Sequence, residues 1–191
     1  VGWFANDVLM LSRLAQVLLK DKPQETKIKR IMIGKDAIAR ADADVAKAMT
    51  GWIEEHLTDS EGVTVSPEGL DPWWDVFRVI QAGEVKSTNL PWVRTHKAKL
   101  GSGIHERFLM AESITDFELN AARKHHKIIV KHLNQLVTPG SVLVIPTAPC
   151  VAPLLNEDAA TLASFRSNTM ALTCVAGLGG LPQVSMPVLT V

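Results

Sequence analysis

Residues 142–149 read VLVIPTAP, and this stretch decides the fold class of the chain. Four consecutive apolar residues end at Pro146, which has no N–H to donate to a strand ladder. A continuous apolar run of this kind predicts a strand buried on both faces, as in a sheet with helices on each side. The following loop, 146–153, contains three prolines and leaves the carboxyl end of the strand, where open α/β sheets place their ligand crevices. We expect this loop to form either a rigid lip beside a pocket or a structural crossover.

The remaining elements alternate around this strand. Thr115-Asp116-Phe117-Glu118 is a capping box, which predicts a helix from there to about Val137, stopped by Thr138-Pro139-Gly140. Further helices are predicted from 8 to 19, from Asp42 or Asp44 to His56, from Asp71 onward, and from 159 to 176; strands are predicted at 28–33, 63–65 and 183–186. We expect polar or loop-like connections at 20–27, 88–103 and 177–182. The order is therefore helix, strand, helix, strand, further helices, strand, helix, strand, which is typical of an α/β fold.

The first predicted helix differs from the others in its apolar content. Nearly all of residues 8–19 are apolar, and Asn6-Asp7 supplies a polar cap before them. A helix that is apolar on most sides is normally packed between layers, so we expect residues 8–19 to be buried.

Composition excludes several classes of protein. The chain has 191 residues, with 20 Lys and Arg against 20 Asp and Glu, so its formal net charge is zero. Hydrophobic residues make up 47% and charged residues 21%, as in a globular domain. Zero net charge argues against a general nucleic-acid binder, and no apolar run is long enough to span a membrane. Two cysteines, Cys150 and Cys174, fit a reducing compartment such as the cytoplasm.

Three groups of residues that could form a functional site are better explained by a structural role. His125, His126 and His132 share a helix but lack the i, i+4 spacing that directs two imidazoles at one metal ion. The glycines at 177–180 lead into Pro182 and a strand rather than a helix N-terminus, so we expect no phosphate site there. Glu84 closes an apolar stripe, and we expect a structural ion pair with Arg94 or Arg107.

Several segments together resemble the amidase signature family. They are VGWFAND at 1–7, FRVIQAGE at 77–84, IHER at 104–107, VLVIPTAP at 142–149 and GLPQVSMP at 180–187, in the family's order and spacing across essentially the whole chain. The opening segment is especially similar to plant-type indole-3-acetamide hydrolases. Gly177 stands where the family often has Asn, as in that plant-type branch. The resemblance implies an α/β/α sandwich around a mixed sheet.

The resemblance also implies a reaction, the hydrolysis of a carboxamide to an acid and ammonia. The family performs it with a Ser-cis-Ser-Lys triad and needs no cofactor or metal. This sequence has no Ser-Ser dipeptide, so no residue here matches the triad. We therefore expect residues 1–191 to be the C-terminal portion of a single amidase domain, truncated at both ends; a processed or trimmed chain is the alternative.

The expected contribution of these residues is the wall of the substrate cleft. Trp92 would offer an apolar face to an aromatic amide, Thr147 a hydroxyl, and Pro149 rigidity, with ordinary packing as the alternative for each. The expected partner is a small-molecule amide, and the resemblance is compatible with a homodimer. Two rival functions remain open: an import-receptor homologue of the chloroplast outer envelope, in which the amidase-like region is a binding scaffold, and a stand-alone amidase-like interaction module.

Overall fold

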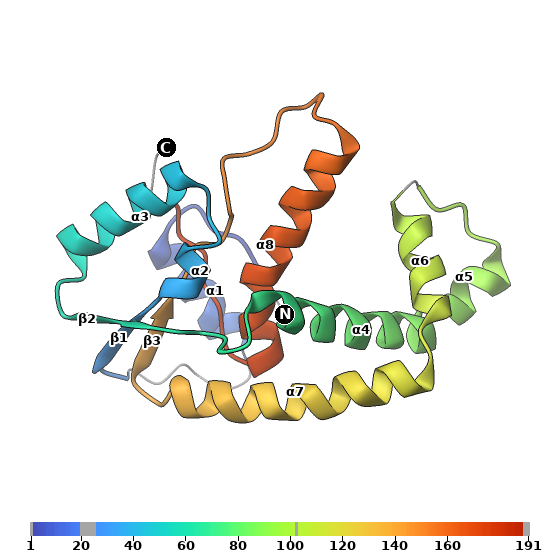
Figure 1. Cartoon of the computed structure of the whole chain (residues 1–191), viewed down its shortest axis with the longest axis horizontal. Helices are drawn as coiled ribbons and strands as arrows, with labels where there is room; N and C mark the ends of the chain where they lie inside the picture. Colours follow the sequence, from blue (N-terminus) through green and yellow to red (C-terminus); the bar gives the residue numbers. More distant parts are fainter. Residues whose placement is uncertain (1, 20–25, 102, 189–191) are drawn as a thin grey trace.

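The computed structural model describes residues 2–19, 26–101 and 103–188. Within these residues the chain forms eight helices and a small parallel sheet, which confirms the α/β class (Figure 1). In chain order the elements are α1 (Val8–Leu18), β1 (Arg30–Gly34), α2 (Lys35–Ile38), α3 (Ala43–His56), β2 (Ser60–Val63), α4 (Leu70–Thr88), α5 (Leu90–His96), α6 (Ile104–Ser113), α7 (Asp116–Leu136), β3 (Ser141–Val144) and α8 (Ala159–Gly179).

The sheet has three strands in the order β2-β1-β3, all parallel. Ile31 of the central strand lies opposite Ser60 on one side and Val142 on the other. β3 is thus an edge strand, and among the described residues no further strand pairs with its free side. Helices lie on both faces of this strand, as predicted, with Leu143 packed on one face and Val144 on the other, but its burial is incomplete, since Val142 is 38% exposed.

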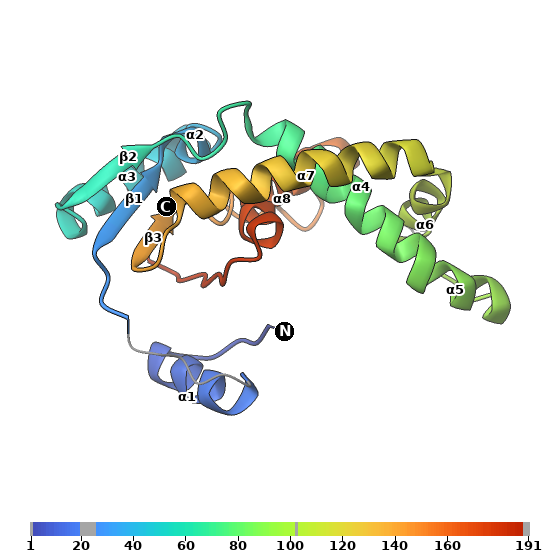
Figure 2. The same ribbon diagram turned by 90° about the horizontal axis from the view of Figure 1, so that it is seen from below.

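The largest layer consists of α4, α7 and α8, which pack against one another and against one face of the sheet (Figure 2). Trp73, Leu133 and Leu172 form its centre and are almost completely buried. Leu143 and Ile145, which point to the same face, pack against this cluster. The capping box that begins α7 is present as predicted, with the Thr115 hydroxyl accepting from the Glu118 N–H and the Glu118 carboxylate accepting from the Thr115 N–H.

The opposite face of the sheet is covered by α3. Met49 and Ile53 pack there on Ile33, with Ile31 and Val144 beside them. Gly34 connects β1 to α2 at a point where a Cβ atom would lie 2.6 Å from Val65 Cγ2 and 2.8 Å from Ile145 Cγ2. Only glycine permits this close approach, which draws the ends of the strands together.

A carboxylate clamp fixes the chain after β2. The two oxygens of Asp36 on α2 accept hydrogen bonds from the backbone N–H groups of Val65 and Ser66, each at 2.8 Å. The Ser66 hydroxyl then donates to the Gly69 carbonyl at 2.6 Å, immediately before α4. The clamp therefore determines where α4 begins relative to the sheet.

Two predicted loops are shorter than expected. Residues 88–103 contain α5, because Pro91 occupies the start of a helix, where its missing N–H costs nothing. α8 continues past 176 to Gly179, and a Cβ at Gly177 would lie 3.0 Å from Phe77 Cε2, so this glycine permits close packing on α4.

Two other predictions are wrong. Residues 183–186 follow α8 without forming a ladder, so the strand predicted there is absent from the described structure. None of the described residues of α1 is buried, although the sequence predicts a packed helix. The connection predicted at 20–27 lies largely outside the described residues.

Two adjacent isoleucines on α7 test this arrangement. Ile129 is 1% exposed and Ile128 is 67% exposed. We predict that Ile129→Ala lowers the free energy of unfolding by about 2–5 kcal/mol, because it leaves a cavity in the core. Ile128→Ala removes the same atoms from the surface and should change it by less than about 0.5 kcal/mol. Urea unfolding followed by circular dichroism measures both, and equal effects would contradict the assigned face of α7.

Candidate functional site

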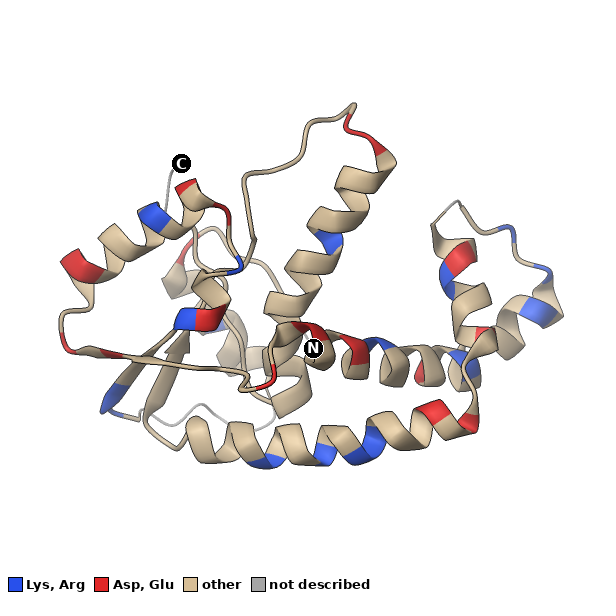
Figure 3. Cartoon of the chain, in the orientation of Figure 1, with Lys and Arg blue, Asp and Glu red and all other residues tan. Residues whose placement is uncertain are grey.

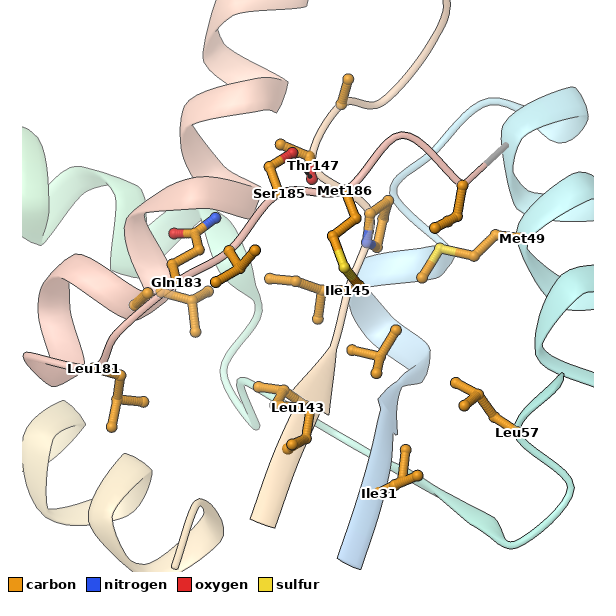
Figure 4. Close-up of a pocket in the computed structure, with 18 of the residues that line it drawn as sticks. Ile31, Met49, Leu57, Leu143, Ile145, Thr147, Leu181, Gln183, Ser185 and Met186 are labelled. Carbon is orange, nitrogen blue, oxygen red and sulfur yellow. Dashed lines mark hydrogen bonds between the residues drawn. The ribbon is translucent and has the colours of Figure 1, made fainter. Parts of the chain in front are cut away.

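A pocket of about 810 Å³ lies along the free edge of β3 (Figure 4). One wall comes from α3 and β1, including Met49 and Ile31, and the other from Leu143, Ile145 and the chain after α8. Because β3 has a neighbour on one side only among the described residues, the pocket contacts residues that point to both faces of the sheet. Its lining is predominantly apolar, which suits a ligand or a protein segment with an apolar surface.

The parallel strands give the pocket two distinct ends. Ile28, Ile31, Leu57 and Val142 lie at or near the amino ends of the strands, and we call them the amino-end part of the pocket. Thr147, Cys150, Ser185 and Met186 lie beyond the carboxyl end of β3, and we call them the carboxyl-end mouth. Ligands of open α/β sheets bind at the carboxyl end, so the mouth is the candidate functional site.

Polar groups gather at this mouth. The hydroxyl oxygens of Thr147 and Ser185 lie 3.1 Å apart and share a hydrogen bond, although the two residues are far apart in the sequence. Gln183 also lines the pocket, and Figure 4 shows its amide on the same extended segment as Ser185. A small set of polar groups in an apolar pocket is the usual means of orienting a ligand.

A backbone hydrogen bond fixes the loop that carries Thr147 to the start of α3. The Pro149 carbonyl accepts a hydrogen bond of 2.7 Å from the Asp42 N–H at the start of α3. Pro149 is buried and does not line the pocket, whereas Thr147 and Cys150 on either side of it do. The structure thus places Thr147 in the lining of the pocket, and the Pro149 carbonyl ties this loop to the start of α3.

Trp92 lies elsewhere. It is on α5, at the far end of α4 from the sheet (Figure 1), where it is 57% exposed and stacks on His96 at 4.7 Å between ring centroids. The structure therefore does not bring Trp92 together with Thr147.

The candidate ion pairs are arranged differently from the expectation. Glu84 is exposed on α4, so water solvates its carboxylate. Arg94 pairs with Glu112 of α6 instead. Among the described residues neither Glu84 nor Arg107 takes part in an ion pair.

The three α7 histidines have separate structural partners. The Nε2 atoms of His125, His126 and His132 lie 2.7 Å from Glu68 Oε1, 2.8 Å from the Leu178 carbonyl oxygen and 3.0 Å from the Val65 carbonyl oxygen, respectively. Across the described part of the chain no cluster of His, Cys, Asp or Glu could hold a metal ion.

Sequence patterns did not identify the α3 side of the pocket. Met49 and Trp52 form an apolar stripe on α3, which predicts packing and contains no chemical motif. Their role in the pocket depends on the free edge of β3, and a strand order is not visible in local sequence. No helix in the described ranges is long and apolar enough to cross a membrane.

The sequence is similar to plant amidases over nearly its whole length. Amidase 1 of Oryza sativa subsp. japonica is 31% identical over 98% of this chain and 50% of the relative, and Amidase 1 of Arabidopsis thaliana is 28% identical over 98% and 52%. Translocon at the outer membrane of chloroplasts 64 of Pisum sativum is 22% identical over 98% of this chain and 36% of that protein. No protein-family model matches. The chain is therefore amidase-like, and it spans about half the length of the Amidase 1 relatives.

The reactivity of the two thiols, Cys150 and Cys174, tests the described packing around the carboxyl-end mouth. Burial, with a smaller contribution from Asp42, raises the pKa of Cys150, and burial raises the pKa of Cys174 to about 12. A raised thiol pKa leaves less thiolate at a given pH, so we predict that iodoacetamide modifies Cys150 more slowly than free cysteine at pH 7.5 and faster as the pH rises. Cys174 should stay unmodified while the chain is folded. Mass spectrometry of the peptides measures both, and equal modification of the two cysteines would contradict the described packing.

Proposed function

We propose that this chain is the later part of an amidase-type hydrolase that converts a small carboxamide to a carboxylic acid and ammonia. The similarity to Amidase 1 proteins over 98% of the chain carries this proposal. In the reaction, water adds across the C–N bond; the acyl carbon gains oxygen and the nitrogen leaves as ammonia. A small uncharged substrate also agrees with a pocket whose walls are mainly apolar.

The contribution of these residues is one wall of the substrate site. The Thr147 and Ser185 hydroxyls at the carboxyl-end mouth would bind the polar end of an amide, as donors to its oxygen or acceptors from its nitrogen. The apolar residues beside them, including Met186, would contact the rest of the molecule. An aryl-acetamide combines these two properties in one compound.

The nucleophile and its base would come from sequence outside this chain. A serine attacks an amide only when a neighbouring base accepts its proton. Among the described residues neither Thr147 nor Ser185 forms a hydrogen bond with a lysine or a histidine. The resemblance assigns this task to a Ser-cis-Ser-Lys triad, and the chain contains no Ser-Ser dipeptide.

A second candidate is a non-catalytic binding scaffold. It is supported by the similarity to Translocon at the outer membrane of chloroplasts 64, which also extends over 98% of this chain, although at 22% identity. The same pocket would then hold a protein segment rather than a substrate.

We predict that the 191-residue chain by itself releases no ammonia from an aryl-acetamide, because it contains no Ser-Ser dipeptide and so no residue that matches the family's nucleophile. A protein of the relatives' length that includes this chain should release it. Glutamate dehydrogenase-coupled detection of ammonia measures both. Turnover by the isolated chain would contradict the proposal, and a longer protein that binds the amide without hydrolysing it would favour the scaffold.

We also predict that Thr147→Val in the longer protein lowers kcat/KM by about 2- to 12-fold, the loss expected for one hydrogen bond of about 0.5–1.5 kcal/mol. Thr95→Val is the matched control, because Thr95 is exposed on α5 and its hydroxyl donates to the Pro91 carbonyl at 2.9 Å. Equal kcat/KM values for the two variants would contradict the proposal that Thr147 binds the substrate.

A further inference from the structure

α7 carries a row of cations on its outer face. Arg123, Lys124, Lys127 and Lys131 are all exposed, and Figure 3 shows Lys and Arg positions following one another along this helix. At helical spacing the four positions lie on one side of α7 and extend over about 12 Å of its axis. We call these four residues the basic stripe.

The basic stripe has no anionic partner in the described part of the chain. None of its residues takes part in an ion pair there, and residues 119–140 contain no Asp or Glu. The helix dipole favours cations only in the last turn, and Lys127 lies two turns before Leu136. Like charges at i, i+4 positions, such as Arg123 and Lys127, lower helix stability. The stability of α7 therefore does not explain the basic stripe.

The acidic residues of the chain are concentrated in another segment. Residues 42–75, which include α3, β2 and the start of α4, contain nine Asp and Glu and a single Lys. Two of these acids lie beside α7. The Glu68 carboxylate is 2.7 Å from His125 Nε2 of α7, and Glu61 pairs with Arg30, which donates to the carbonyl of the last residue of α7 at 3.1 Å. The basic stripe is thus a narrow positive surface with carboxylates next to it.

Two large apolar side chains border the basic stripe. Phe117 is 83% exposed and Ile128 is 67% exposed. Both lie on the same side of α7 as Lys124, at spacings of seven and four residues from it. A partner that covers this face therefore has to present carboxylates and apolar side chains close to one another.

We propose that the outer face of α7 binds an acidic, amphipathic segment of a partner protein. Its carboxylates would pair with the basic stripe, and its apolar side chains would contact Phe117 and Ile128. The narrowness of the stripe favours a single peptide segment. A flat membrane surface or a nucleic-acid duplex is wide enough to bring its anionic groups close to Glu61 and Glu68 as well, and like charges repel. This binding does not depend on any hydrolytic activity of the chain.

Fluorescence anisotropy with a labelled synthetic peptide tests the basic stripe. The probe is a helix-forming peptide of about 15 residues with Glu at i, i+4 positions and Leu beside them. We expect the 191-residue chain to bind this peptide. Lys124→Glu/Lys127→Glu should weaken binding by at least about tenfold, because each change replaces an attraction with a repulsion. Both lysines are exposed, so the variant should fold, and circular dichroism establishes this.

A second double variant separates the basic stripe from net charge. Lys97→Glu/Lys99→Glu makes the same change in net charge at two exposed lysines between α5 and α6. It should alter binding by less than about threefold, because salt screens distant exposed charges. Equal losses of affinity in the two double variants would overturn the proposal, since they would show a general response to charge.

A pair of matched apolar variants tests the border of the stripe. Ile128→Ala should weaken binding by about 2- to 5-fold, because it removes apolar area from the contact. Leu109→Ala is the control, since Leu109 is an isomeric side chain that is 52% exposed on α6. Equal affinities of these two variants would contradict an amphipathic partner.

Three further results would overturn the proposal. The first is a chain that does not bind the peptide. The second is tighter binding of phosphatidylserine vesicles or heparin than of the peptide, with the same loss in Lys124→Glu/Lys127→Glu, which would assign the basic stripe to a membrane or a polyanion. The third is a protein of the relatives' length that does not bind the peptide while the 191-residue chain does, since the rest of that protein would then cover α7.

Discussion

The free edge of β3 is the constraint on which the rest of the structure depends. In the described part of the chain β1 has a partner on both sides, whereas β3 has one, so apolar side chains that would be covered in a wider sheet are open to water. Edge strands of this kind are templates for pairing and are normally covered or blocked. The pocket, the exposed Val142 and the extended segment beside Thr147 all follow from this incomplete pairing.

Local signals in the sequence were sufficient for some of the helices, whereas α2 and α5 were not predicted. The capping box at Thr115 and Glu118 depends on residues three positions apart, and it begins α7 as predicted. The prediction of a strand at 183–186 is wrong, because a strand forms only beside a hydrogen-bonded partner strand. No local sequence pattern shows whether that partner strand is present. α8 continues through Gly177, where the absence of a side chain leaves room for Phe77, a residue distant in the sequence.

The same distinction applies to the candidate site. The position of Thr147 beside a pocket was predictable, because ligands of open α/β sheets generally bind beyond the carboxyl ends of the strands. Thr147 does line the pocket. The position of its partner Ser185 was not predictable, since their contact depends on the path of the chain after α8. Trp92 was expected in the cleft wall for its chemistry alone, and it lies on α5, outside the lining of this pocket.

The apolar lining of the pocket extends well beyond the two hydroxyls at its mouth. A pocket of about 810 Å³ falls in the range that encloses a drug-sized ligand, and few of the residues around it are polar. Hydrophobic burial is non-directional, so the same surface suits an amide, a helix face or a neighbouring strand. What separates these occupants is the polar pair at Thr147 and Ser185, which lies at one end only. A substrate would therefore be held at that end, where the two hydroxyls can meet its polar group.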